Sequence, residues 1–223
     1  MSTHDGREDH STGFLFIIEG IDGTGKTTQA RKLEDRLKDA GYDVVRLHEP
    51  TDSEWGTKIR NLAIHGRTVN PRQELEYFIN DRKIDVEKYI KPSLSAGQIV
   101  IMDRYYLSNV AYQGALGIDP EEILEMNDFA PRPDLILILD VAPEIGLSRI
   151  NDRENGQPNY FEDPEYLTKV RKIFRWLERN LSNAQIIDAT PPVEDIAKRI
   201  WNVIITYIEK NAGTTRPRIE ETS

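Results

Sequence analysis

The sequence predicts an α/β fold in which a five-stranded parallel sheet is covered by helices on both faces. Short apolar runs alternate with longer segments of helical periodicity, the order that successive βαβ units require. The run at 134–140 contains Leu-Ile-Leu-Ile-Leu without a polar residue, which is typical of a strand buried on both faces. A length of 223 residues suits one such domain with a large core.

Apolar spacing and capping signals place the elements. Strands are expected at 14–18, 43–47, 98–102, 134–140 and 185–187. Helices are expected from 27 to 40, 55 to 64, 71 to a stop or kink near Pro92, 108 to 113, 119 onward, 143 to 149, 163 to 181 and 193 to 210. In the first helix one face carries Ala30, Leu33, Leu37 and Ala40, and Gly41 ends the helix. Asn70 precedes a proline as an N-cap would.

Composition excludes several classes of protein. The net charge of −9 argues against nucleic acid or an anionic membrane as the main partner. The absence of cysteine excludes disulfides, thiolate metal sites and a thiol nucleophile. No apolar run approaches the length of a bilayer span, and residues 1–13 lack the apolar segment of a signal peptide. We expect a cytoplasmic protein with one domain at 14–210, a flexible N-terminal tail at 1–13 and a flexible C-terminal tail at 211–223.

A glycine-rich turn follows the first strand and reads G-x-x-x-x-G-K-T. Its glycines allow successive backbone N–H groups to point at one anion. Lys26 would supply a charge for the β- and γ-phosphates, and the Thr27 hydroxyl would ligate Mg²⁺. We therefore predict a nucleoside triphosphate site made by Gly20, Ile21, Asp22, Gly23, Thr24, Gly25, Lys26, Thr27 and Thr28.

Three carboxylates follow the first three predicted strands, namely Asp22, Glu49 and Asp103. In a parallel sheet the carboxyl ends of the strands share one edge, where ligands bind. The guanine-reading N-K-x-D motif of a GTPase is missing, so a small-molecule kinase is the favoured class.

Further motifs occur together and in order with the phosphate-binding loop. They are Glu49-Pro50, Phe78-x-x-x-Arg82, Asp103-Arg104-Tyr105 and Ser108-Asn109-x-x-Tyr112-Gln113-Gly114. Over residues 14–210 this set resembles the thymidylate kinase family. The resemblance implies a three-layer P-loop kinase fold with a short lid, at about 150–162. It also implies ATP-dependent, Mg²⁺-assisted phosphorylation of dTMP to dTDP in nucleotide biosynthesis, typically by a homodimer.

The resemblance assigns the acceptor base to two helices. Phe78 would stack on thymine, and Arg82, four residues later on the same helical face, would donate to a ring carbonyl. Asn109, Tyr112 and Gln113 would lie beside the base and sugar, with Tyr112 crowding the 2′ position. Alternatively, Phe78 is a core residue below a solvated Arg82, Tyr112 is packing, and Asn109 is a helix cap.

The resemblance also assigns the phosphates and metal. Asp103 would support Mg²⁺ through water, and Arg104 would grip the acceptor phosphate with its planar fork. Asp22 would lie near the acceptor sugar and the metal, while Glu49 and Pro50 belong to the acceptor side. The alternatives are a structural ion pair of Asp103 with Arg104, and an Asp22 that hydrogen-bonds its own loop.

The polar stretch at 151–159 corresponds to the family's lid. The phosphate-binding loop lacks the arginine found there in some family members, so the transition-state cation is expected from the lid side. Arg149 and Arg153 are the candidates, either of which could simply be solvated, and Glu162 would contact the acceptor nucleotide.

Two departures from the family pattern leave the acceptor open. His48 stands where an arginine commonly precedes Glu-Pro, and Thr51-Asp52-Ser53 replaces Gly-Gly-Thr. The remaining alternatives are a kinase of the same fold for another nucleoside monophosphate or a nucleoside, and a nucleotide-binding paralogue without catalysis.

Overall fold

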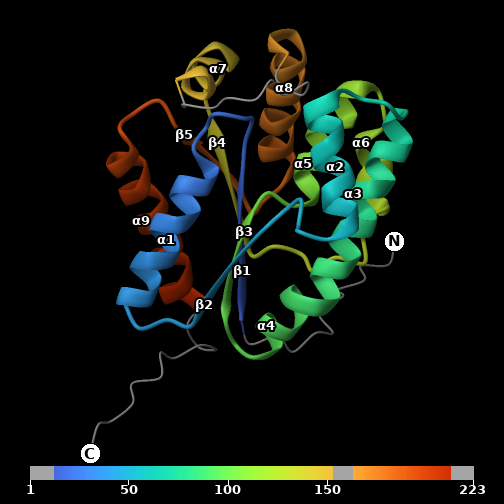
Figure 1. The fold of residues 1–223 in the computed structure, drawn as a ribbon. Coiled ribbons are helices and arrows are strands. Elements are labelled where there is room, and N and C mark those ends of the chain that lie inside the picture. Colours follow the sequence, from blue (N-terminus) through green and yellow to red (C-terminus); the bar gives the residue numbers. More distant parts are fainter. Residues whose placement is uncertain (1–12, 153–162, 212–223) are drawn as a thin grey trace, which may run out of the picture.

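The computed structural model describes residues 13–152 and 163–211. Within them, five parallel strands form one sheet in the order β2-β3-β1-β4-β5 (Figure 1). The strands are β1 (Phe14–Glu19), β2 (Val44–His48), β3 (Ile99–Asp103), β4 (Leu135–Asp140) and β5 (Ala184–Asp188). The predicted α/β class and the parallel five-stranded sheet are confirmed.

Helices alternate with the strands as predicted. They are α1 (Lys26–Asp39), α2 (Glu54–His65), α3 (Pro71–Asp85), α4 (Lys91–Ser95), α5 (Tyr106–Tyr112), α6 (Pro120–Glu125), α7 (Pro143–Asn151), α8 (Pro164–Asn180) and α9 (Val193–Asn211). Helices α1 and α9 cover one face of the sheet, while α4, α5 and α8 lie on the other, with α2 packed outside α3 (Figure 1). The molecule therefore has three layers.

The core lies on the three inner strands. Every residue of β1 and β3 is buried, as the uninterrupted apolar runs predict. In α1, Ala30, Leu33 and Leu37 pack inward, but Ala40 is exposed because the helix has already ended there. Gly41 follows with a φ of 86° and closes the helix with its N–H on the Lys38 carbonyl, so the predicted stop is confirmed.

The helix that begins at Pro71 was expected to stop or kink near Pro92, and the structure shows that it does not stop there. Asn70 caps it as predicted, accepting from the Gln73 N–H at 3.0 Å. Helical hydrogen bonding does not stop at Pro92 but runs on to Ser95, through a π-helical turn at Val86–Ile90. A proline lacks the N–H that the α-helical ladder needs and crowds the carbonyl four residues earlier, and the wider turn relieves both constraints.

No helix within 13–152 and 163–211 is both long enough and apolar enough to span a bilayer. Most of the predicted lid and both predicted tails, apart from Gly13 and Asn211, lie outside the described residues.

Candidate active site

The phosphate-binding loop joins β1 to α1 in the conformation that its glycines allow. Gly20, Gly23 and Gly25 have φ values of 140°, 78° and 90°, which side chains disfavour. The Lys26 ammonium donates to the Ile21 carbonyl at 2.8 Å, inside the curve of the loop. The loop and the N-terminus of α1 thus surround a space suited to a phosphate chain.

The loop also rests on α7 through backbone contact. A Cβ added to Gly23 would lie 2.1 Å from the Gly146 carbonyl oxygen, and one added to Gly146 would lie 2.5 Å from the Asp22 carbonyl oxygen. Neither position has room for a side chain. Gly146 carries no motif signal in the sequence, so only the structure identifies it.

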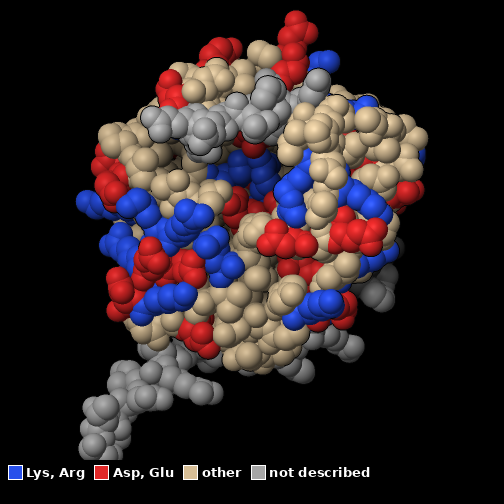
Figure 2. Space-filling model, viewed as in Figure 1, with Lys and Arg blue, Asp and Glu red and all other residues tan. Residues whose placement is uncertain are grey.

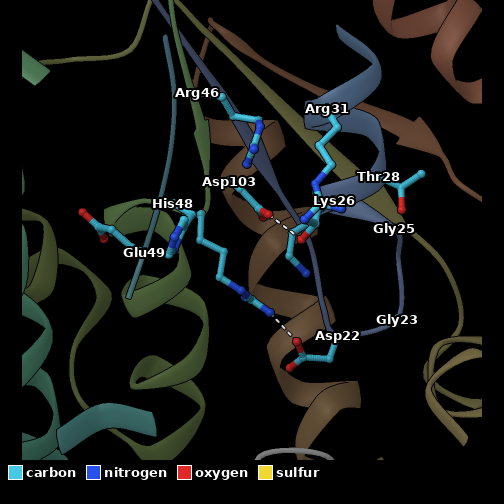
Figure 3. Close-up of a pocket in the computed structure, with 12 residues that line it drawn as sticks. Asp22, Gly23, Gly25, Lys26, Thr28, Arg31, Arg46, His48, Glu49 and Asp103 are labelled. Atoms are coloured by element: carbon cyan, nitrogen blue, oxygen red, sulfur yellow. Dashed lines mark hydrogen bonds and ion pairs between the residues drawn. The ribbon is translucent and has the colours of Figure 1, made fainter. Parts of the chain in front are cut away.

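A cleft of about 360 Å³ opens over the loop, at the carboxyl ends of β1, β2 and β3. It is lined by Asp22, Gly23, Gly25, Lys26, Thr27, Thr28, Arg31, Arg46, His48, Glu49, Asp103 and Arg104. Figure 3 shows Arg31 and Arg46 reaching into it from opposite sides, and Figure 2 shows Lys and Arg gathered around the same hollow. Despite the net charge of −9, positive charge is concentrated here, as phosphate recognition requires.

Arg31 and Arg46 line the cleft although neither was a predicted site residue. Arg46 lies two residues before His48, so the alternation of side chains along β2 puts both residues on one face. This spacing could have indicated that Arg46 borders the cleft. The Arg46 guanidinium is paired with Glu34 at 2.7 Å while it borders the cleft.

Burial and charge shift the pKa of Lys26. Burial comes first and the nearby Arg104 second, and together they lower the pKa of Lys26 to about 8. A bound polyphosphate would supply the opposite charge that this ammonium needs.

Thr27 and Asp103 form the part of the cleft that fits a magnesium ion. The Thr27 hydroxyl donates to the Asp103 carboxylate at 2.5 Å. Both offer hard oxygen ligands, and Mg²⁺ commonly takes one or two such groups together with phosphate oxygens and water. No cluster of three or more His, Cys, Asp or Glu side chains suited to a metal occurs within 13–152 and 163–211.

Arg104 and Asp22 face each other across the cleft as an ion pair. Tyr112 donates its hydroxyl to the other Asp22 oxygen at 2.9 Å, and Arg104 contacts the Ser108 hydroxyl at 3.3 Å. Burial is the largest single influence and disfavours the charge on Asp22, but the Arg104 guanidinium, the Lys26 ammonium and the Tyr112 hydroxyl together outweigh it and lower the pKa of Asp22. The expected alternative, in which Asp103 is the ion-pair partner of Arg104, is not what the side chains show.

Glu19, at the end of β1, fixes the segment that carries Arg104. Its buried carboxylate accepts from the Tyr105 N–H at 2.9 Å, the Ser108 N–H at 3.1 Å and the Ser108 hydroxyl at 2.6 Å. It therefore caps α5, whose own N-cap residue provides no side-chain hydrogen bond. Arg104 precedes this cap with a φ of 71°, in the left-handed region that non-glycine residues rarely adopt.

A second cavity, of about 230 Å³, adjoins the cleft and shares Asp22 and Arg104 with it. Its wall is partly apolar and partly amide, and it is lined by Asp22, Pro50, Ile59, Arg60, Ala63, Glu74, Phe78, Arg104, Ser108, Asn109, Tyr112 and Gln113. The structure thus brings Pro50 and Phe78 together with the predicted residues Asn109 and Tyr112 of α5 and with Gln113, which follows that helix. Asn109 is only 1% exposed, and its Oδ1 atom has no hydrogen-bond partner within the described chain.

Arg82 does not line this cavity. It is fully buried, donates from Nε to both Glu49 oxygens at 3.0 Å, and donates from Nη1 to the Asn127 carbonyl at 2.5 Å. The alternative of a solvated Arg82 is therefore wrong, and its contact with a thymine carbonyl stays a prediction. The sequence missed Glu49 as the partner because the two residues lie on separate elements.

The loop that departs from the family pattern is held by one side chain of α3. Asp81 accepts from the Thr51 N–H at 2.7 Å, from the Thr51 hydroxyl at 2.5 Å and from the Ser53 hydroxyl. The two hydroxyls thus tie the loop to α3, beside Pro50 in the cavity wall.

Of the residues predicted to act from the lid side, Arg149 is described by the structure and two others are not. Arg149 donates to the carbonyls of Ala189 at 2.9 Å and Thr190 at 3.3 Å, and it does not line either cavity. Arg153 and Glu162 lie outside the described residues. Which arginine serves the transition state stays a prediction.

Known proteins share this sequence over most of its length. The family model for thymidylate kinase matches residues 18–200. A probable thymidylate kinase of Archaeoglobus fulgidus is 45% identical over 202 residues, which are 89% of this chain and 100% of the relative. Thymidylate kinases of Xylella fastidiosa (strain M23) and Xanthomonas oryzae pv. oryzae (strain PXO99A) are 44% and 46% identical, over 90% and 88% of this chain and 91% and 85% of theirs.

Proposed function

Because the chain belongs to the thymidylate kinase family, we propose that it transfers the γ-phosphoryl group of ATP to the 5′-phosphate of dTMP, yielding dTDP and ADP, with Mg²⁺ bound. It is a nucleoside monophosphate kinase, and thymidylate is its acceptor. The observation that carries the proposal is the junction of two unlike cavities at Asp22 and Arg104. One cavity suits a polyphosphate, and the other suits a base.

The donor belongs over the phosphate-binding loop. Backbone N–H groups from Gly20 to Thr28 and the Lys26 ammonium would hold the phosphates, and the hydroxyl of Thr27 with the carboxylate of Asp103 would hold Mg²⁺. The ion, when bound, neutralises charge on the β- and γ-phosphates.

The acceptor belongs in the second cavity. The exposed side of Phe78 offers a ring for stacking, and the unpartnered Asn109 Oδ1 offers an acceptor. Thymine has one ring N–H, at N3, and this donor would satisfy that buried oxygen. Tyr112, fixed to Asp22, would then lie beside the sugar.

Arg104 would meet the acceptor phosphate where the two cavities join. Its guanidinium can donate two parallel hydrogen bonds to phosphate oxygens, and its pairing with Asp22 aims it before the substrate arrives. Phosphoryl transfer then needs in-line positioning and charge neutralisation rather than a strong base, because a phosphate monoester is already ionised near neutral pH. Arg149 or Arg153 would add a further cation, and Glu162 would approach the acceptor.

Three broader features complete the proposal. Residues 14–210 form one catalytic domain, while most of the predicted lid at 150–162 and of the two predicted tails lies outside the described residues. The enzyme is a homodimer, as the family resemblance implies. It acts in the cytoplasm, where its nucleotide substrates are made.

An acceptor panel tests the function. ADP release from Mg·ATP would be followed with dTMP, dUMP, dCMP, dGMP, AMP and thymidine, each over a range of concentrations. We expect dTMP to give the highest kcat/KM. A higher value for another monophosphate would reassign the acceptor, while tight ATP binding without acceptor-dependent ADP release would indicate a non-catalytic paralogue.

A further inference from the structure

A line of hydrogen bonds leads from the α2–α3 connection to the base cavity. Arg67 pairs with Glu74 Oε2 at 3.0 Å, and Gln113 Nε2 donates to Glu74 Oε1 at 2.8 Å. Asn109 Nδ2 donates to Gln113 Oε1 at 3.0 Å, and the line ends at Asn109 Oδ1, which has no hydrogen-bond partner among residues 13–152 and 163–211. Glu74, Gln113 and Asn109 are 0%, 1% and 1% exposed, so water cannot replace these partners freely.

The chemistry of the groups gives the line only one direction. An ionised carboxylate accepts hydrogen bonds and donates none. Gln113 must therefore present its NH₂ group to Glu74, which leaves its carbonyl for Asn109. Asn109 must present its NH₂ group in turn, which leaves its carbonyl as the amide group still available to a base in the cavity that Asn109 lines.

The reverse direction is strongly disfavoured. Turning both amides over would place the Gln113 carbonyl against the Glu74 carboxylate, two acceptors without a proton between them. Such a clash in a buried site is costly because the local dielectric is low. The Arg67 cation stabilises the carboxylate that imposes this order.

We propose that Glu74 is a positioning residue that sets acceptor selectivity, because it forces Asn109 to offer a carbonyl rather than an NH₂ group to the base. Resting on the proposed function, this arrangement favours bases that carry a hydrogen at N3, as 4-oxopyrimidines do. Cytosine has a bare acceptor at N3, and it would face the Asn109 oxygen with no proton between them.

Replacing Glu74→Gln tests the proposal. The new amide can accept or donate, so the line can run in either direction and Asn109 can offer its NH₂ group to cytosine. We expect the ratio of kcat/KM for dTMP to that for dCMP to fall about tenfold or more, mostly through KM. The ratio for dTMP against dUMP should hold, since both bases carry the N3 hydrogen.

Two further variants make the test specific. Glu122→Gln makes the same chemical change in the exposed pair with Arg72, whose contacts are 2.6 and 2.9 Å, and should leave both ratios unchanged. Gln113→Leu cuts the line between Glu74 and Asn109 and should lower the dTMP-to-dCMP ratio as well. Thermal unfolding of each protein shows whether it is folded. If Glu74→Gln does not fold, the selectivity of Gln113→Leu decides the proposal instead.

The outcomes separate the two proposals. If the wild-type enzyme does not prefer dTMP, the proposed function fails. If it prefers dTMP and folded Glu74→Gln keeps the selectivity of Glu122→Gln, the positioning role is overturned while the function stands. If the dTMP-to-dUMP ratio changes as much as the dTMP-to-dCMP ratio, the cavity is merely loosened and the positioning role is likewise overturned.

Discussion

The guanidinium of Arg104 is paired with the carboxylate of Asp22, at the point where the phosphate cleft meets the base cavity. The Tyr112 hydroxyl donates to the Asp22 carboxylate. The Glu19 carboxylate accepts from the N–H of Tyr105, the residue after Arg104, and so fixes the backbone next to Arg104. The cation is therefore oriented by three separate elements, β1, the phosphate-binding loop and α5. Such support favours a fixed position for the acceptor phosphate.

Arg104→Lys tests whether the planar fork matters and not only the charge. An ammonium keeps the charge but cannot donate two parallel hydrogen bonds, so we expect kcat/KM for dTMP to fall about 100-fold. Steady-state kinetics with saturating Mg·ATP measures this, and thermal unfolding checks the fold. The matched change Arg72→Lys, in an exposed pair, should leave kinetics unaltered. Near-normal turnover of Arg104→Lys would contradict the assigned role.

The pKa of Lys26 gives a pH dependence with a definite sign. Because the pKa is lowered to about 8, the free enzyme loses this positive charge as pH rises through 8. We expect kcat/KM for ATP to fall above pH 8, whereas kcat should fall only at higher pH, because bound phosphates stabilise the ammonium. Initial rates from pH 6.5 to 9.5 would show it. A kcat/KM for ATP that stays level to pH 9.5 would contradict the expectation that ATP binding depends on the positive charge of Lys26.

Arg82→Met distinguishes a structural role from base recognition. Removing Arg82 leaves the Glu49 carboxylate buried without its partner, and breaking such a pair typically costs about 3–5 kcal/mol of unfolding free energy. Urea denaturation measures the loss, and Arg72→Met serves as the exposed control. A stable Arg82→Met protein with a greatly raised KM for dTMP would instead favour contact with the base.

Asp85→Asn should stabilise the protein at alkaline pH. Asp85 is 2% exposed, and burial, with the charge of Asp81 second, raises the pKa of Asp85 to about 7. Its folded pKa exceeds its unfolded value, so the stability it contributes is complete below pH 4 and is lost as pH rises through 7. An amide resembles the protonated acid and avoids this loss.

Melting curves at pH 5 and pH 8.5 measure the effect. We expect the Tm of Asp85→Asn relative to wild type to be at least about 2–4 °C higher at pH 8.5 than at pH 5, which corresponds to about 1 kcal/mol. The exposed Asp39→Asn provides the control. Equal Tm differences at both pH values would show that Asp85 does not titrate in this range.

Local sequence patterns predicted the elements and the conformation of the glycine-rich loop, because each depends on neighbouring residues. Strand bounds follow from apolar runs, the α3 cap from Asn70, and the loop geometry from its glycines. Pro92 shows the limit of such rules, since a π-helical turn absorbs a proline without ending the helix.

Pairings between distant segments could not be predicted in this way. Nothing near Arg82 in the sequence indicates that Glu49 will neutralise it, and nothing near Glu74 indicates that it sets the direction of the Asn109 amide. Asn109 was identified through the family motif, but its unpartnered oxygen appears only once α3 and α5 are packed together.

The contact between Gly23 and Gly146 has a consequence for how such sequences can diverge. The Gly146 backbone occupies the space that a side chain on Gly23 would need, and the Asp22 carbonyl occupies the space that a side chain on Gly146 would need. A single replacement at either position would push the phosphate-binding loop away from α7, and no change of rotamer could relieve it. We expect the two positions to stay glycine together among active homologues, or to change only alongside a displaced α7.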